Sequence, residues 1–250
     1  MAELDRRYQT AVGTGARARV GIDEGLRAFM LGVYNNMALG LAVTGLAALA
    51  AFYMAVDQAT GTLTAFGETI YLSPLRWVII FAPLAFVFGL SAMVERMEPA
   101  TARMVFFAFA ATMGLSLSSI FLVFTGESII RTFFITAAAF GSLSLWGYTT
   151  KRDLSGWGSF LFMGLIGLII AMIVNLFMQS SALQFAVSVI GVLIFAGLTA
   201  YDTQRLKAVY DQVAGDGTAA ARASILGALR LYLDFINLFM FQLQFLGNRE

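Results

Sequence analysis

The sequence contains no cysteine and no histidine. The lack of cysteine excludes disulfides, thiolate metal sites and cysteine nucleophiles. The lack of histidine excludes zinc–histidine sites, haem with a histidine ligand and Ser-His catalysis, and it removes the usual near-neutral pH switch. Any proton chemistry must therefore come from carboxylates.

Charged residues are also scarce. They form 12% of the chain, against about 25% in soluble domains. The net charge of +1 leaves no basic excess to neutralise phosphates, which argues against a nucleic-acid partner. Apolar residues reach 59%, and the mean hydropathy is +0.80. A soluble domain of 250 residues has too little interior for that much apolar surface, so much of the chain must lie in a lipid bilayer.

Seven apolar runs are long enough to cross a hydrocarbon core of roughly 30 Å, and they predict an all-α membrane protein. Residues 1–26 are predicted to be a cytoplasmic N-terminal tail, and residues 27–250 a seven-helix transmembrane domain. The connections between the runs are too short to hold a second domain. The predicted spans are Arg27–Val56, Leu75–Val94, Thr101–Phe124, Ile129–Tyr148, Ser159–Met178, Leu183–Tyr201 and Ser224–Leu246.

Positive charge is unevenly divided between the two sides of these spans. With the N-terminus in the cytoplasm, 13 of the 16 Lys and Arg residues fall on the inner side, and only Arg76, Arg131 and Arg249 fall outside. Cytoplasmic segments are enriched in Lys and Arg. The bias therefore predicts a cytoplasmic N-terminus and, after seven spans, a C-terminus on the outer side.

The last span carries a polar stripe. At about 100° per residue, its polar residues fall within an arc of roughly 80° together with Phe241. The polar members are Arg230, Asp234, Asn237 and Gln244. Such a stripe should not face lipid, so this helix is expected against the other helices, near the centre of the bundle.

Asp234 lies about ten residues into that span, where a carboxylate costs about 2.5–3.5 kcal/mol and needs a partner. One candidate is Arg230, one turn earlier on the same face, which would form an internal ion pair. The other is Asp202, at the cytoplasmic end of the sixth span, although Asp202 is also consistent with a surface residue beside Arg205 and Lys207. Because spans six and seven are antiparallel, both aspartates fall in the inner half of the membrane. Two carboxylates in contact titrate as a unit, and such a pair is the plausible device for sensing near-neutral pH in a chain without histidine.

Three motifs resemble one known family. Residues 231–239 read Leu-Tyr-Leu-Asp-Phe-Ile-Asn-Leu-Phe and closely resemble the signature last helix of the Bax inhibitor-1 family, also called the transmembrane Bax-inhibitor-motif family. Residues 201–204, Tyr-Asp-Thr-Gln, resemble the family's motif closing the sixth helix, and residues 174–177, Val-Asn-Leu-Phe, fit the fifth. The chain is therefore similar to a bacterial member from about Arg27 onward.

The resemblance implies six helices around a central seventh, and a calcium leak gated by protonation of Asp202 and Asp234. These two aspartates would also be transient calcium ligands, supported by Arg230 and Asn237. Because calcium prefers six to eight oxygen ligands, two aspartates with water make a loose site that suits transit. The resemblance further implies that Arg96, at the inner end of the second span, latches the closed state. No cofactor is expected, and the partners would be lipid, calcium ions and protons in a bacterial inner membrane.

Two other functions compete with the leak. Certain bacterial relatives modulate a membrane-bound quality-control protease by association, but some of these lack the aspartate pair that this chain keeps. An intramembrane aspartyl protease would also use two aspartates on adjacent helices. Its Gly-x-Gly-Asp motif is missing at Asp234, which follows Tyr232 and Leu233. An enzyme is therefore not expected, and the ion-handling interpretation is favoured.

Overall fold

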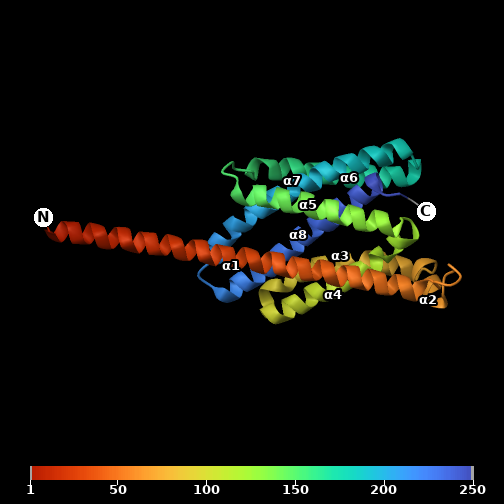
Figure 1. The fold of residues 1–250 in the computed structure, drawn as a ribbon, viewed down its shortest axis with the longest axis horizontal. Coiled ribbons are helices and arrows are strands. Elements are labelled where there is room, and N and C mark those ends of the chain that lie inside the picture. Colours follow the sequence, from red (N-terminus) through yellow and green to blue (C-terminus); the bar gives the residue numbers. More distant parts are fainter. Residues whose placement is uncertain (1, 249–250) are drawn as a thin grey trace.

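The computed structural model describes residues 2–248, with side chains described from Glu24 onward. Within this part of the chain, seven helices are long and apolar enough to cross a membrane, which confirms the seven predicted spans (Figure 1). The first span, Glu24–Ala55, is the later part of a longer helix that extends past the bundle. The seven helices are α1 (Ala2–Ala55), α3 (Leu75–Met93), α4 (Pro99–Leu117), α5 (Gly126–Thr149), α6 (Ser155–Met178), α7 (Ser181–Val213) and α8 (Gly217–Leu246).

Helix α8 is the centre of the bundle. It runs between one group formed by α1, α3 and α4 and another formed by α5, α6 and α7 (Figure 1). In its most apolar stretch 72% of the residues are buried inside the protein, against 11–33% in the other six spans. The predicted arrangement of six helices around a central seventh is thus confirmed.

The connection predicted at residues 202–223 is wrong. Helix α7 continues to Val213, and α8 begins at Gly217, so that only a tight turn separates them. The extension of α7 is amphipathic, because Leu206 and Tyr210 are buried, and the Tyr210 ring packs 5.4 Å from that of Phe29. Asp216 then caps α8 by accepting hydrogen bonds from two backbone N–H groups. Asp202 therefore lies within a helix, not at its end.

A short helix also interrupts the connection predicted between the first two spans. Helix α2 (Ala65–Tyr71) begins after Thr64, whose hydroxyl accepts a hydrogen bond from the N–H of Gly67. Two 3-10 turns, η1 (Val94–Arg96) and η2 (Ser118–Leu122), follow α3 and α4.

Small residues bring neighbouring helices into backbone contact. A Cβ on Gly114 of α4 would meet the carbonyl oxygen of Thr44 on α1, and a Cβ on Gly147 of α5 would meet that of Ala200 on α7. The stripe of Ala110, Gly114 and Ser118 is buried, as close helix packing requires.

The bundle has two ends of different charge. We call the end that holds η1, the α5–α6 connection and the α7–α8 turn the basic end, because most Lys and Arg residues lie there. The other end, which holds α2, η2 and the α6–α7 connection, is called the far end.

Candidate functional site

Two members of the polar stripe of α8, Asp234 and Gln244, face α7. Asp234 is 5% exposed, and the side chain of Asp202 on α7 lies within hydrogen-bonding distance of it. Toward the far end, Gln244 Oε1 accepts a hydrogen bond from Ser188 Oγ of α7 at 3.3 Å. The two aspartates that the sequence singled out are therefore neighbours in the fold.

The two aspartates differ in exposure, because Asp234 is buried and Asp202 is partly exposed. Asp234 Oδ2 is buried and accepts no hydrogen bond from any residue that the structure describes. Asp202 is half-buried and lies toward the basic end. An acidic oxygen without a donor can be satisfied by a proton shared with a second carboxyl group, or by a cation.

Positive charge acts on the pair from a distance. Arg230 exerts an electrostatic influence on both aspartates, and Arg205 on Asp202. Arg230 is exposed, and within residues 24–248 no ion pair joins it to either carboxylate. The internal ion pair considered from the sequence is therefore not formed, and the second carboxyl group is the immediate neighbour of Asp234.

The other residues expected to support the pair make their described hydrogen bonds with other groups, or make none. Asn237 Nδ2 donates to the carbonyl of Leu233 in its own helix at 2.8 Å. Arg96 is exposed in η1, and α8 approaches this turn through Arg222, whose Nε donates to the carbonyl of Met97 at 2.8 Å. Within residues 24–248, no hydrogen bond or ion pair joins Arg96 to either aspartate. Its role as a latch stays a prediction.

The residues that follow Asp202 fix α7 to its neighbours. Thr203 Oγ1 lies 2.9 Å from Ser144 Oγ on α5, which in turn lies 2.6 Å from the Tyr34 hydroxyl on α1. Gln204 donates to the carbonyl of Arg152 and accepts from the N–H of Leu154, which holds the α5–α6 connection. The tail of the Tyr-Asp-Thr-Gln motif thus has a positioning role. Sequence reasoning missed Ser144 and Tyr34, because only the fold brings them beside Thr203.

The motif in the fifth span points outward. In α6, Leu176 is 73% exposed and Phe177 is 81% exposed, so these residues belong to the lipid-facing surface. Asn175 Oδ1 accepts from the N–H of Ser180 and so stabilises the turn into α7. We find no contact between this motif and the aspartate pair within the described residues.

Buried polar groups continue from the aspartates toward the far end. Thr136 Oγ1 on α5 donates to Gln242 Oε1 on α8 at 2.6 Å, and both side chains are buried. One turn away, Thr132 Oγ1 is buried and makes no hydrogen bond with the described residues. Within residues 24–248, no three His, Cys, Asp or Glu side chains come together in a group able to hold a metal ion.

Two aspartates outside the membrane spans, Asp57 and Asp153, have a pKa below the usual value of an aspartate. Hydrogen bonds from the N–H of Ala59 and from the Thr60 hydroxyl hold the pKa of Asp57 below its usual value. The side chain and N–H of Ser155 do the same for Asp153. Both carboxylates therefore stay ionised at neutral pH and are protonated only below the ordinary carboxyl range.

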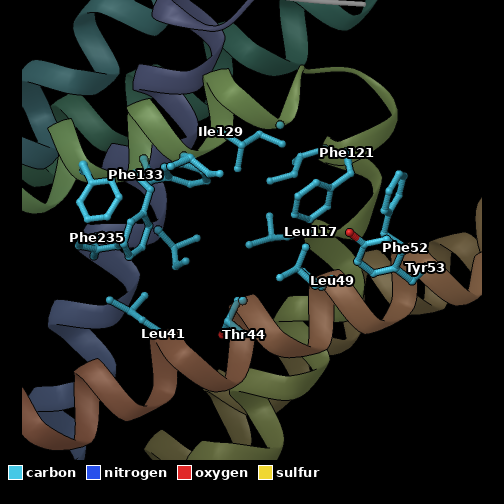
Figure 2. Close-up of a pocket in the computed structure, with 18 residues that line it drawn as sticks. Leu41, Thr44, Leu49, Phe52, Tyr53, Leu117, Phe121, Ile129, Phe133 and Phe235 are labelled. Carbon is cyan, nitrogen blue, oxygen red and sulfur yellow. The ribbon is translucent and has the colours of Figure 1, made fainter. Parts of the chain in front are cut away.

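Two cavities lie along the seam between α1 and α5. The far-end cavity, of about 600 Å³, is surrounded by side chains of α1, α5 and α8 and by Leu117 and Phe121 (Figure 2). The basic-end cavity, of about 810 Å³, is lined from Arg27 to Leu41 on α1. Leu41 and Phe235 line both cavities.

Six membrane-spanning helices around a central seventh that carries a buried acidic residue define a polytopic all-α membrane protein. A family model described as inhibitor of apoptosis-promoting Bax1 matches residues 26–250. The chain belongs to this Bax inhibitor-1 family.

Similar proteins span nearly the whole chain. The inner membrane protein YbhL of Escherichia coli K12 is 49% identical over 227 residues, which cover 90% of this chain and 94% of that protein. A protein of Caulobacter vibrioides is 48% identical over 251 residues, with full coverage of both chains. One of Rickettsia prowazekii is 48% identical and covers 91% of this chain and 92% of its own. Each match covers at least 90% of this chain.

Proposed function

We propose that the protein is a pH-sensitive calcium leak channel of the bacterial cytoplasmic membrane, gated by Asp202 and Asp234. The observation that carries this proposal is the burial of Asp234 on the central helix with a second carboxyl group as its side-chain neighbour. An ionised carboxylate at the centre of a membrane helix costs about 2.5–3.5 kcal/mol. Such a pair is stable when it shares a proton or holds a cation, and this links its state to pH and to calcium.

The proposed orientation places the basic end in the cytoplasm, with the N-terminus inside and the C-terminus outside. Asp202, which is half-buried, then lies on the cytoplasmic side of the pair. Proton exchange with the cytoplasm through Asp202 would set the fraction of open channels.

The transport role needs no catalytic step and no cofactor. Calcium favours six to eight oxygen ligands, and two carboxylates with water bind it loosely enough for release. The buried oxygens of Thr132, Thr136 and Gln242 extend the polar surface beyond the pair. Arg230 would tune the pair by its charge, and Asn237 and Arg96 are proposed to support the closed state.

Calcium flux into proteoliposomes loaded with a calcium indicator tests this function. Wild-type protein should carry calcium at a rate that changes with pH when it is assayed from about pH 5 to pH 8, because two carboxyl groups that share a proton titrate as one unit. Asp234→Asn should remove this pH response. Asp57→Asn is the matched control, because Asp57 stays ionised over the whole range and should not contribute. Flux no faster than through empty liposomes would contradict the proposal.

A second candidate function is association with a membrane-bound quality-control protease. The observation that favours it is the outer face of α6, a helix that packs mainly on α7 and exposes Leu176 and Phe177. A photo-crosslinking residue at Phe177 should capture such a protease in cells, whereas one at the buried Leu90 should not. Equal capture at both positions, or capture at neither, would contradict this role.

A further inference from the structure

The seam between α1 and α5 is poorly closed. These helices scarcely contact each other, and the hydrogen bond between Tyr34 and Ser144 joins them near the basic end. The basic-end cavity lies along this seam, and it is lined by apolar side chains apart from that pair, Arg27 and Tyr148. Leu31 and Leu145 on its rim are 52% and 64% exposed, so the cavity opens sideways toward the lipid.

The length of this cavity matches one leaflet. Its lining on α1 runs from Arg27 to Leu41, which corresponds to about 21 Å of helix. One leaflet, with its headgroup region included, contributes about half of a bilayer roughly 40–45 Å thick. A lipid whose headgroup lies at the level of Arg27 would therefore end near Leu41 and Phe235, where the far-end cavity begins.

The mouth of the cavity carries positive charge. Arg27 is exposed, and no described acidic side chain pairs with it, although Glu24 lies one turn earlier on α1. Lys207 on α7 places a second positive charge beside Tyr148, which lines this cavity. Its Nζ donates to the Tyr148 carbonyl at 2.8 Å and lies 5.1 Å from the centre of the Tyr148 ring. Basic groups at the cytoplasmic end of an apolar gap between membrane helices attract anionic lipid headgroups.

We propose that the basic-end cavity binds one anionic phospholipid of the cytoplasmic leaflet, with its phosphate against Arg27 and one acyl chain along Met30, Met37 and Phe140. The leaflet follows from the proposed orientation, whereas the binding itself does not depend on calcium transport. The lipid would fill the seam beside the Tyr34–Ser144–Thr203 contacts that position α7. Lipid composition would then influence the helix that carries Asp202.

Two glycines allow a matched test of the cavity. Gly141 lines the basic-end cavity and Gly45 lines the far-end cavity, and a Cβ on either would meet no other atom within 4 Å. Gly141→Leu should therefore fill the proposed lipid site without displacing a neighbour. Gly45→Leu adds the same side chain to the other cavity and is the control.

Native mass spectrometry of the purified full chain with equal amounts of phosphatidylglycerol and phosphatidylcholine measures the binding. The wild type should retain one phosphatidylglycerol with about a fivefold preference, the size expected for one basic side chain at a membrane surface. Arg27→Gln should lose the preference, and Arg27→Lys and Arg131→Gln, which changes an exposed arginine elsewhere, should keep it. Gly141→Leu should reduce binding of both lipids at least fivefold, and Gly45→Leu should not.

Several results would overturn this proposal. Equal binding of the two lipids by the wild type would mean non-selective contact with bulk lipid. If the wild type is a dimer without selective lipid binding, and Gly141→Leu dissociates that dimer, then a second copy of the chain closes the seam. If Arg27→Gln fails to fold, the two glycine variants decide, and indistinguishable lipid binding by them would refute the site.

Discussion

Tyr232 offers a direct test of how the central helix is held in the bundle. Its side chain is fully buried, and its hydroxyl lies 2.6 Å from Thr44 Oγ1 on α1. Thr44 Oγ1 also lies 2.9 Å from the carbonyl oxygen of Ala110 on α4. The ring packs edge-on against Phe106 and Phe109, at 5.9 Å and 5.2 Å between centroids. Tyr232→Phe preserves this ring packing and removes only the hydroxyl.

The expected loss follows from the energetics of hydrogen bonds between membrane helices. These contribute about 0.6 kcal/mol on average and up to about 1.7 kcal/mol. Because the Tyr232 hydroxyl is fully enclosed and its loss leaves a lone pair of Thr44 unsatisfied, we expect the free energy of unfolding to fall by about 1 kcal/mol. Reversible unfolding in mixed micelles, with SDS as the denaturant, measures this change.

A double-mutant cycle with Thr44→Val isolates the contact, and the coupling energy should equal most of the single-variant loss. Tyr53→Phe is the control, because Tyr53 is 61% exposed and its hydroxyl makes no hydrogen bond with the described residues. Our reasoning is refuted if Tyr232→Phe changes stability no more than Tyr53→Phe, or if the coupling falls below about 0.3 kcal/mol.

Three further predictions concern packing, electrostatics and topology. Gly147→Ala should lower the free energy of unfolding by about 1–3 kcal/mol, because the added Cβ meets the backbone of Ala200. Gly141→Ala is the control and should leave stability unchanged, because its Cβ meets nothing within 4 Å. Equal effects of the two variants would contradict the close approach of α5 and α7. Arg230→Gln should move the midpoint of pH-dependent calcium flux to higher pH, because losing a nearby positive charge favours the protonated pair. An unchanged midpoint would show that the Arg230 side chain only extends to the cytoplasmic membrane–water interface. Reporter fusions after Leu26, at Gly215 in the α7–α8 turn and at Glu250 should report inside, inside and outside, and a cytoplasmic C-terminus would contradict the proposed orientation.

Much of the architecture was predictable, because lipid imposes long apolar helices and the polar stripe of the last span must turn away from lipid. The extension of α7 to Val213 was not, because its charged residues resemble a loop until Leu206 and Tyr210 are seen to be buried. Helix α2 was also missed, since seven residues carry too little periodicity to identify a helix.

The site was predictable in its central pair and not in its surroundings. Matching depth on antiparallel helices was sufficient to bring Asp202 and Asp234 together, because α7 and α8 are consecutive. The hydroxyl contacts of Ser144 with Thr203 and Tyr34 join residues up to 110 positions apart, and no local pattern indicates such a contact. The same applies to Gln242 and Thr136, which lie 106 positions apart.

The pH profile of calcium flux in proteoliposomes containing Asp202→Asn, Asp234→Asn or both tests the central claim most directly. If the two carboxyl groups form one titrating unit, each single variant should flatten the profile and the double variant should add little, because neighbours in one network are not additive. Asp153→Asn, which changes an aspartate that stays ionised at neutral pH, should keep the wild-type profile. A wild-type pH profile in both single variants would contradict the account, because the pair would then be structural and the gate would lie elsewhere.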